Sequence, residues 1–336
     1  MLFVVGLQDS GTIAKKASEG GHVVLKPIIP FEPIAVNQIP TGENWVAQIK
    51  WDGVRILSYC EGGEVRLINR RQNDRTMQYP ELQDPKAYCS ASSFILDGEM
   101  IALDSSRPSF HEIMKRDSVR REQSVRLATK QTPVTYMVFD VLYVDGEWVH
   151  ERTLAQRQQL LRDIIIPQAY IQIVQNFTDG QALYDVMLKH EMEGIVCKDL
   201  NSTYVCDGKD KRWQKKKIFR DLYAVIGGVT LQHGVANALL LGLYNDTGAL
   251  LYIGHAGTGT FSRKGWEELT ERLRPLIIER SPFSNEPKRS RDALWVKPEI
   301  VVKVEYMEWT PGHTMRHPTL QGIVEMSKEE CTLMQI

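Results

Sequence analysis

Residues 45–55 read WVAQIKWDGVR, and this stretch decides the fold. Its first six residues predict a β-strand, Asp52-Gly53 predicts a turn, and residues 54–60 predict a second strand. A lysine between a strand and a turn, such as Lys50, points its amine into the cleft that the strand ends line. The pattern Lys-x-Asp-Gly is short, however, and by itself it is more typical of a solvated hairpin lysine than of a catalytic one.

The segments around this stretch predict an α+β protein with antiparallel sheets. Further strands are expected at residues 65–68, 94–103 and 134–144, and the last of them ends in the hairpin turn Asp145-Gly146. Helices are expected at residues 109–128, 154–164 and 182–190, with Thr153 and Asp179 as caps of the second and third. The order of these segments does not follow the regular strand–helix alternation of a parallel sheet.

The chain changes character after Arg220. Short apolar segments between glycine-rich turns predict strands at residues 225–229, 238–244, 250–253 and 300–309, with one helix near residues 266–278. Several short strands with a single helix are typical of a small β-barrel such as an OB-fold. We therefore expect an N-terminal appendage of uncertain order at residues 1–25, one domain at residues 26–220 and an OB-fold domain at residues 221–336.

The composition limits the class of protein. A length of 336 residues suggests two domains, and the 43% of hydrophobic and 25% of charged residues are close to the globular average. No apolar run approaches the roughly 20 residues that span a bilayer, and the first residues lack the basic start of a signal peptide. Five cysteines without a CxxC pair argue against a disulfide framework or a zinc knuckle. A cytoplasmic monomer without membrane contact is the expectation.

One segment is strongly basic although the net charge of the chain is only −1. Residues 209–220 read KDKRWQKKKIFR, with Trp213 and Phe219 among the cations. Most runs of this kind are solvated faces. Because strand residues alternate between two faces, however, Lys215 and Lys217 would lie on one side, which favours a strand that faces phosphate.

Six short motifs follow one another along the chain. They are Lys50-Trp51-Asp52-Gly53-Val54-Arg55, Asn69-Arg70-Arg71, Leu96-Asp97-Gly98-Glu99, Phe139-Asp140-Val141-Leu142, Glu193-Gly194-Ile195-Val196-Cys197-Lys198 and Trp213-Gln214-Lys215-Lys216-Lys217. The series resembles the covalent nucleotidyltransferase superfamily. In its spacing and flanking segments it is most similar to ATP-dependent DNA ligases, above all to the ligase domain of bacterial non-homologous end-joining ligases. The resemblance extends roughly over residues 25–323.

The resemblance implies a fold and a reaction. The fold would be a nucleotidyltransferase domain, ATP-grasp-like, with antiparallel sheets and flanking helices, followed by the OB-fold barrel. In the reaction, AMP from ATP is attached to a lysine, passed to the 5′-phosphate of nicked double-stranded DNA and displaced by the 3′-hydroxyl, with Mg²⁺ or Mn²⁺ as cofactor. The attacking lysine must be neutral, and deprotonating a free lysine at pH 7 costs about 4 to 5 kcal/mol. Neighbouring cations lower that cost.

The resemblance also implies a role for each matched residue. Lys50 matches the adenylylated nucleophile, and Asp52 matches the acid of the same motif. Glu99 and Glu193 match carboxylates near the ribose and the metal, and we expect both as metal ligands. Phe139, which would otherwise be read as a core residue, matches the ring that stacks on adenine. Lys198, Lys215 and Lys217 match the contacts of the α-phosphate and are expected, with Lys50 and Asp52, to be catalytic. Arg55 and Arg70 match residues near the nucleotide sugar and the nick phosphate, and Arg316 is expected at the triphosphate. Asp97 is left out as a turn or buried acceptor.

Two departures from the family pattern stand out. The family usually places a glycine two positions after the arginine that Arg70 matches, and this chain has Gln72 there. The terminal motif is present only in its first half, residues 314–318, because the expected arginine and Asp-Lys pair are absent from residues 323–328. Either Lys328 substitutes for them, or charging of the enzyme by ATP is impaired.

Other functions stay open on the sequence alone. An RNA ligase or a capping-type guanylyltransferase would use the same chemistry, and the latter would carry GMP instead of AMP on Lys50. A catalytically impaired OB-type DNA-binding module is the alternative of a different class. The sequence also leaves open whether nicks or double-strand ends are the substrate in DNA repair, and whether a Ku-like end-binding protein recruits the enzyme at the bacterial nucleoid.

Overall fold

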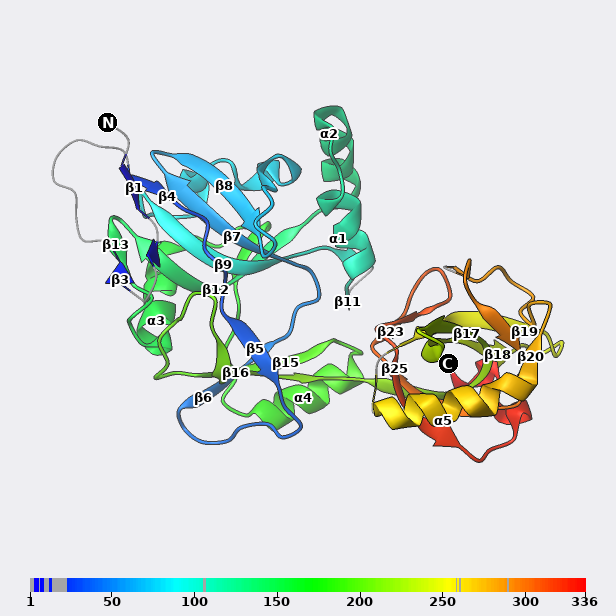
Figure 1. The fold of residues 1–336 in the computed structure, drawn as a ribbon. Coiled ribbons are helices and arrows are strands. Elements are labelled where there is room, and N and C mark those ends of the chain that lie inside the picture. Colours follow the sequence, from blue (N-terminus) through cyan, green and yellow to red (C-terminus); the bar gives the residue numbers. More distant parts are fainter. Residues whose placement is uncertain are drawn as a thin grey trace. The chain divides into compact units, whose positions relative to one another are not determined.

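The computed structural model describes residues 3–5, 7–8, 12–13, 23–104, 107–257, 259, 261–288 and 290–336. The chain divides into two compact units, Met1–Ile218 and Phe219–Ile336 (Figure 1). Most of the expected appendage at residues 1–25 lies outside the described residues. Its described pieces form two small sheets, in which β1 (Phe3–Val5) pairs with β4 (Val23–Leu25) and β2 (Leu7–Gln8) pairs with β3 (Thr12–Ile13).

A six-stranded sheet is the larger sheet of the first unit. Its strands run in the order β13-β12-β9-β7-β8, with β14 beside β12, and all neighbours are antiparallel except β12 and β14. The bounds are β7 (Val54–Glu61), β8 (Glu64–Asn69), β9 (Phe94–Ile101), β12 (Thr135–Val144), β13 (Glu147–Trp148) and β14 (Ile171–Ile173). At Gly62 and Gly63 the φ angles are 58° and 83°, so the turn between β7 and β8 uses the left-handed conformation that glycine adopts easily.

A four-stranded sheet lies beside it in the order β5-β16-β15-β6. Its strands are β5 (Glu32–Ala35), β6 (Trp45–Ile49), β15 (Gly194–Asp199) and β16 (Lys209–Lys217), and only β5 and β16 are parallel. One face is apolar because Ala47, Ile195 and Cys197 pack against Leu183 and Met187 of helix α4. The lysines of β15 and β16 therefore lie mainly on the other face, as the alternation of strand residues requires.

Four helices accompany the sheets of the first unit: α1 (Phe110–Asp117), α2 (Glu122–Gln131), α3 (Leu154–Ile164) and α4 (Gly180–Lys189). Helix α3 has the expected bounds, and Thr153 and Gln156 form a capping box at its start. The single helix expected at residues 109–128 is wrong, because the chain forms two helices there. The break is held by tertiary contacts, since the carbonyl of Val119 accepts from Gln78 Nε2 at 2.6 Å instead of continuing a helix. A small hairpin of β10 (Leu103–Asp104) and β11 (Arg107–Pro108) precedes α1.

The second unit is a curved sheet with one helix. Its strands are β17 (Arg220–Gln232), β18 (Val235–Tyr244), β19 (Leu250–Ala256), β20 (Ile277–Ile278), β21 (Leu294–Val296), β22 (Val301–Tyr306) and β25 (Thr319–Val324), beside a hairpin of β23 (Glu308–Trp309) and β24 (Met315–Arg316). Helix α5 (Arg263–Leu273) is capped by Ser262, and its first residue, Arg263, lies three residues before the expected start. Short 3-10 helices complete the two units at Thr76–Gln78, Pro80–Leu82, Pro85–Ala87, Arg274–Leu276, Lys328–Glu330 and Leu333–Gln335.

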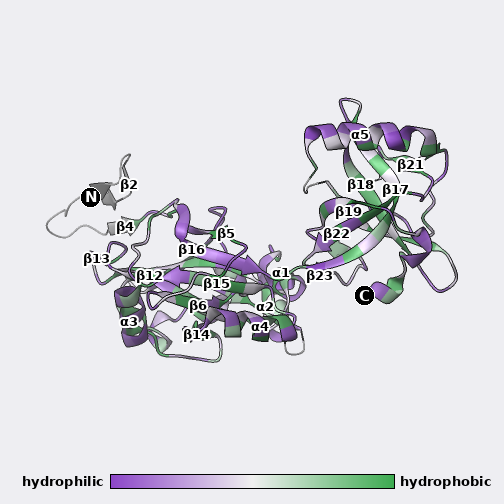
Figure 2. Ribbon diagram, turned by 90° about the horizontal axis from the view of Figure 1, so that it is seen from below, coloured by the Kyte–Doolittle hydropathy of each residue, from purple (hydrophilic) through white to green (hydrophobic). Residues whose placement is uncertain are grey.

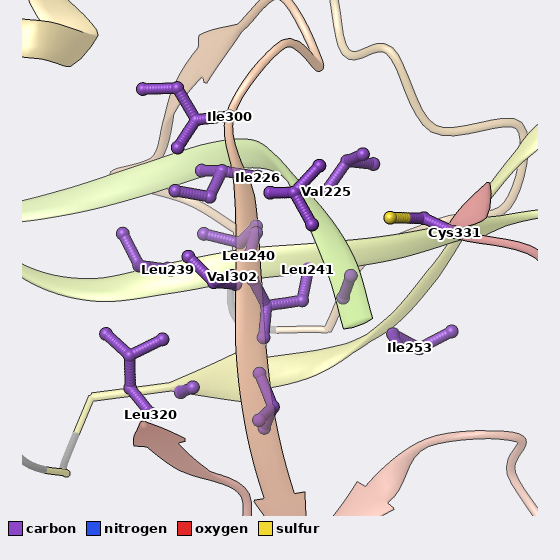
Figure 3. Packing of buried hydrophobic residues seen from close by; sticks show 14 of the residues in the cluster. Val225, Ile226, Leu239, Leu240, Leu241, Ile253, Ile300, Val302, Leu320 and Cys331 are labelled. Atoms are coloured by element: carbon purple, nitrogen blue, oxygen red, sulfur yellow. The ribbon is translucent and has the colours of Figure 1, made fainter. Parts of the chain in front are cut away.

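The core of the second unit is independent of the first. Ile226, Leu240, Leu241 and Val302 are fully buried and pack with neighbouring aliphatic side chains (Figure 3). In Figure 2, β17 and β18 are largely green, whereas purple and green alternate along α5. The ladder pairings leave this sheet open, and an isolated bridge between Gly259 and Leu320 connects the segment after β19 to β25. None of the described helices is long and apolar enough to cross a membrane.

Candidate active site

The amine of Lys50 lies in a cluster of charges at one end of the four-stranded sheet. Lys50 directly follows β6, and its backbone N–H donates to the carbonyl of Gly194 at the start of β15, at 3.0 Å. This pairing places Lys50 beside Glu193, whose carboxylate accepts from Lys50 Nζ at 2.5 Å and contacts Lys217 Nζ at 3.1 Å. The side chains of Lys50 and Glu193 are 20% and 7% exposed.

Glu193 is the charged partner of both amines. Burial alone would raise the pKa of this carboxyl, but the charges of Lys50 and Lys217 outweigh burial and hold the pKa below its usual value. Glu193 is therefore ionised at neutral pH.

Lys215 adds a third amine to the same face. The pairing of β15 with β16 sets Val196 against Lys215 and Gly194 against Lys217, so both lysines lie on the face that α4 leaves open. Burial lowers the pKa of Lys215, and the charges of Lys217 and Lys50 lower it further. The amines of Lys50 and Lys217 at Glu193, with the amine of Lys215 close enough to be affected by both, leave a local excess of positive charge, which favours a polyphosphate ligand.

Gly53 lets the turn after Lys50 approach the six-stranded sheet. A Cβ atom at Gly53 would lie 2.2 Å from the carbonyl oxygen of Met100 on β9, closer than any side chain permits. The absence of a side chain thus allows the two sheets to meet at Lys50.

Glu99 lies on the opposite wall, on β9, where it pairs with Arg55 on β7. The pKa of Glu99 is raised to about 8, mainly by burial; the charges of Lys50 and Arg55 act to lower it, whereas those of Glu193 and Asp52 act to raise it. These mutual effects show that the structure brings Glu99, Asp52 and Glu193 into one electrostatic neighbourhood around Lys50.

Phe139 stands at an irregularity of β12. The register with β9 shifts between Val138 and Asp140, so Phe139 is the extra residue of a β-bulge. Its ring lies edge-on to Trp213 of the four-stranded sheet, with ring centroids 5.9 Å apart. Asp140, the next residue, forms a fully buried bidentate pair with Arg157 of α3 at 2.7 and 2.9 Å. The pair fixes the bulge, and the bulge directs Phe139 toward the other sheet.

Lys198 lies between aromatic rings. Its Nζ is 3.8 Å from the ring centroid of Trp213 and 4.2 Å from that of Phe139, and it has no hydrogen-bond partner among the described residues. Burial lowers the pKa of Lys198 to about 7 against the attraction of Asp140 and Asp97. The structure therefore places Lys198 beside the rings of Trp213 and Phe139, whereas Lys50 and Lys217 contact Glu193.

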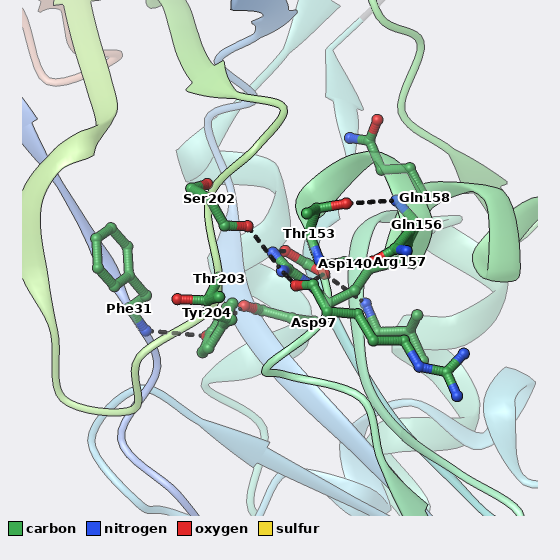
Figure 4. A network of polar contacts seen from close by, with 12 residues as sticks. Phe31, Asp97, Asp140, Thr153, Gln156, Arg157, Gln158, Ser202, Thr203 and Tyr204 are labelled. Carbon is green, nitrogen blue, oxygen red and sulfur yellow. Dashed lines mark hydrogen bonds and ion pairs between the residues drawn. The ribbon is translucent and has the colours of Figure 1, made fainter. Parts of the chain in front are cut away.

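Arg55 is held by a closed set of hydrogen bonds, two members of which, Phe31 and Tyr204, lie outside the six motifs. Its Nε and Nη2 donate to the two carboxylate oxygens of Asp97 at 2.9 and 2.6 Å, and its Nη1 donates to the carbonyl of Phe31 at 2.6 Å. The hydroxyl of Tyr204 donates to Asp97 at 2.8 Å and accepts from the N–H of Phe31 at 2.9 Å (Figure 4). Burial opposes the charge of Arg55, but Asp97 outweighs it, so the pKa of the guanidinium is raised.

The sequence contained a partial signal for this set. Asp97 belongs to the segment Leu96-Asp97-Gly98-Glu99, where an aspartate before glycine looks like a turn residue. In the structure it lies inside β9 and is fully buried. Tyr204 lies in an irregular loop without periodicity, so only the fold reveals its role.

Two further expected contact residues have acidic partners of their own. Arg70 follows β8, is 61% exposed, and its Nε contacts Glu32 of β5 at 2.8 Å. Arg316 belongs to the second unit, on β24, where its Nη1 donates to Glu308 at 2.7 Å. Within the described residues, no group of three or more His, Cys, Asp or Glu side chains is placed to hold a metal ion.

Two family models match the chain. The one described as ATP dependent DNA ligase domain matches residues 33–217, and the one described as ATP dependent DNA ligase C terminal region matches residues 232–325.

The chain is also similar to individual proteins. It is 30% identical over 289 residues to the multifunctional non-homologous end joining protein LigD of Mycolicibacterium smegmatis. It is 32% identical over 287 residues to the multifunctional non-homologous end joining DNA repair protein LigD of Mycobacterium tuberculosis. These matches cover 84% and 83% of this chain but 36% of each relative. Among solved structures, mycobacterial DNA ligase D complexed with ATP and MES is 28% identical with a TM-score of 0.50, over 91% of this chain and 98% of that chain.

Proposed function

The chain belongs to the ATP-dependent DNA ligase family, and from that membership we propose that it seals nicks in double-stranded DNA through an AMP adduct on Lys50. The observation that supports this most directly is the contact of Lys50 Nζ with Glu193 at 2.5 Å, inside a cluster of amines that suits a triphosphate.

In the first step, Lys50 Nζ would attack the α-phosphorus of ATP. A nitrogen–phosphorus bond forms while the bond from this phosphorus to the bridging oxygen of the β-phosphate breaks, and pyrophosphate leaves. The lysine amine loses its protons in the process, and Glu193 is the base within hydrogen-bond distance of that amine. Lys215 and Lys217 would stabilise the charge on the α-phosphate oxygens.

The remaining residues would bind the nucleoside. The ring of Phe139 would stack on adenine with Lys198 beneath it, and the frame of Asp97 and Tyr204 would hold Arg55 at the sugar. Base stacking on an aromatic side chain is worth about 1 to 3 kcal/mol. Asp52 would contribute to the field around Lys50, as its effect on Glu99 indicates.

Glu193 and Glu99 fit a magnesium ion by their chemistry. Mg²⁺ in such sites takes one or two carboxylates together with substrate phosphates, and these two carboxylates share one electrostatic neighbourhood. When bound, the ion would neutralise charge on the triphosphate.

The two units would divide the work. We assign residues 26–220 as the adenylylation domain and residues 221–336 as the OB-fold domain that binds DNA. The names of the LigD relatives place those proteins in non-homologous end joining. We propose end joining as the setting of this chain too, with or without a Ku-like partner. The reaction would take place in the cytoplasm.

The decisive experiment labels the nucleophile. The protein is incubated with radiolabelled ATP or GTP and Mg²⁺, and the adduct is mapped by mass spectrometry. We expect AMP on Lys50 and no GMP adduct. Lys50→Ala should abolish the adduct, and Lys50→Arg should do so too, because a guanidinium stays protonated. An adduct of undiminished yield in the Lys50→Ala protein would contradict the proposal, and a GMP adduct would indicate a capping-type enzyme.

A further inference from the structure

We propose that Glu32, Arg70 and Lys209 form a phosphate-exchange site, in which the carboxylate of Glu32 holds the two cations until a phosphate of the DNA displaces it. The inference rests on the proposed function, because it concerns how the DNA substrate is held. Two members of this site, Glu32 and Lys209, lie outside the six motifs.

The contacts of Glu32 resemble those of a bound anion. Its Oε1 lies 2.8 Å from Arg70 Nε, and its Oε2 lies 3.8 Å from Lys209 Nζ, so each oxygen faces one cation. The cations are 61% and 60% exposed, whereas Glu32 is 24% exposed. The group keeps one net positive charge and presents both cations to solvent. A phosphate could meet both of them with more oxygen atoms than a carboxylate offers.

The backbone around Arg70 is fixed. The side-chain oxygen of Asn69 accepts from the backbone N–H groups of residues 71 and 73, both at 3.0 Å. Gln72 Nε2 donates to the carbonyl of Ile28 at 3.0 Å, which ties the turn to the segment before β5. The turn therefore presents Arg70 at a defined place.

The backbone of the other two members is fixed by a different sheet. Glu32 on β5 and Lys209 on β16 are register partners, and the N–H of Glu32 donates to the carbonyl of Gly208 at 2.8 Å. Arg70 follows β8 of the six-stranded sheet. Glu32 thus joins cations from both sheets that form the active site, and only side chains must move for the exchange.

The charges of Glu32 and Lys209 also act on Lys215 in the active site. Burial, Lys217 and Lys50 are the main causes of the lowered pKa of Lys215, but Lys209 lowers this pKa too, and Glu32 raises it. The residue before Glu32 is Phe31. Its carbonyl accepts a hydrogen bond from Arg55, and its N–H donates one to the hydroxyl of Tyr204. A phosphate that replaced Glu32 would therefore lie close to the residues that hold Arg55.

Displacing Glu32 costs little. An exposed ion pair contributes little to stability, because solvent screens it. A DNA phosphate that neutralises a cation also releases counterions, and this gain falls with salt concentration. The carboxylate therefore acts as a weak competitor that lowers DNA affinity without blocking the site.

The test compares Glu32→Gln with the wild type. Binding to a fluorescent nicked duplex is measured by anisotropy over a series of KCl concentrations, in EDTA and without ATP, so that no chemistry occurs. We expect Glu32→Gln to bind about three- to tenfold more tightly at low salt, with a steeper log–log salt slope by about one. The matched control is Glu122→Gln, which removes an exposed ion pair with Arg126 on α2 and should change affinity less than twofold.

A second pair of variants assigns the gain to this site. In a protein that already carries Arg70→Ala and Lys209→Ala, adding Glu32→Gln should bring no gain. A gain that persists there, or equal affinity and slope for Glu32→Gln and wild type, would overturn the proposal. A gain confined to nicks with a 5′-phosphate identifies the terminal phosphate as the ligand, and an equal gain with a 5′-hydroxyl identifies a backbone phosphate. Because no step needs Lys50, a missing AMP adduct would refute the proposed function without affecting this result.

Discussion

The hydroxyl of Tyr204 connects Phe31 and Asp97, the two residues that hold the guanidinium of Arg55. It accepts from the backbone of Phe31 and donates to Asp97, which in turn holds Arg55 on both of its oxygen atoms. Arg55 lies 5.3 Å from the ring centroid of Phe139, so the frame sets the place of the guanidinium against the stacking ring. Tyr204 is therefore a positioning residue and not a catalytic one.

Replacing Tyr204 by phenylalanine should weaken nucleotide binding more than chemistry. The change leaves the N–H of Phe31 and one oxygen of Asp97 short of a partner, which costs about 1 to 3 kcal/mol in stability. We expect the KM for ATP in AMP-adduct formation to rise about three- to tenfold, while kcat changes less than threefold. The matched control is Tyr88→Phe, which also removes a buried hydrogen bond, to the carbonyl of Leu82. It should lower stability alone, and an unchanged KM in Tyr204→Phe would contradict the role.

Glu99 should make the stability of the metal-free protein depend on pH. Its pKa is about 8 in the folded chain, because burial raises it, and it is near the ordinary value in the unfolded chain. Between these values the folded state binds more protons than the unfolded state, so stability falls as pH rises toward about 8 and then levels off. Glu99→Gln should flatten this decline. Thermal melting from pH 5 to 9 in EDTA measures it, and an equal slope in both proteins would refute the effect.

The strands were more predictable than their irregularities. In residues 54–60 and 134–144, apolar residues either alternate with polar ones or follow one another without a break. Either pattern is enough to identify β7 and β12. The bulge at Phe139 could not be predicted, because a bulge depends on the register with a partner strand. The break between α1 and α2 also depends on a tertiary contact, because the side chain of Gln78 donates a hydrogen bond to the carbonyl of Val119. For the site, the motifs identified the amines around Glu193, whereas the contacts of Asp97 and Tyr204 depend on tertiary neighbours.

The turn after β8 shows why the family favours glycine at the position of Gln72. Its φ of 62° is left-handed, and such a conformation costs a non-glycine residue about 1 to 2 kcal/mol. Gln72 compensates in part, because its side chain donates to the carbonyl of Ile28.

Two substitutions of Gln72 should separate these terms. Gln72→Ala keeps the strain and loses the hydrogen bond, so we expect it to lower the free energy of unfolding by about 1 kcal/mol. Gln72→Gly loses the bond but also the strain, and we expect a change below about 0.5 kcal/mol. Urea unfolding followed by tryptophan fluorescence measures both, and an alanine variant as stable as the wild type would show that the side-chain bond contributes nothing.

Each unit has its own core, yet the proposed reaction needs both. Arg316 lies in the second unit and belongs to the shortened terminal motif, while Lys50 lies in the first. One site must bind ATP first and a nick later, so a residue from the second unit can act at one stage and not at the other. We expect that stage to be the reaction with ATP.

Arg316→Ala should therefore slow AMP-adduct formation at least tenfold but leave the sealing of a chemically pre-adenylylated nick nearly unchanged. Lys215→Ala should impair both steps, because the α-phosphate is present in both. Rapid-quench measurements with labelled ATP and with pre-adenylylated DNA distinguish the two. Normal charging with poor sealing in Arg316→Ala would instead identify the arginine as a DNA contact.

The hydrogen bond between Phe31 and Tyr204 spans 173 positions of the chain. A pocket with such a high contact order cannot assemble from local pieces, because closing a loop of this length must precede the contacts that reward it. During synthesis, β6, which directly precedes Lys50, emerges early but remains without its partner strand β15 until much later, and Tyr204 and β16 follow later still. A nascent chain is therefore unable to take up nucleotide until nearly the whole first unit has left the ribosome, and its exposed strand edges need protection until then.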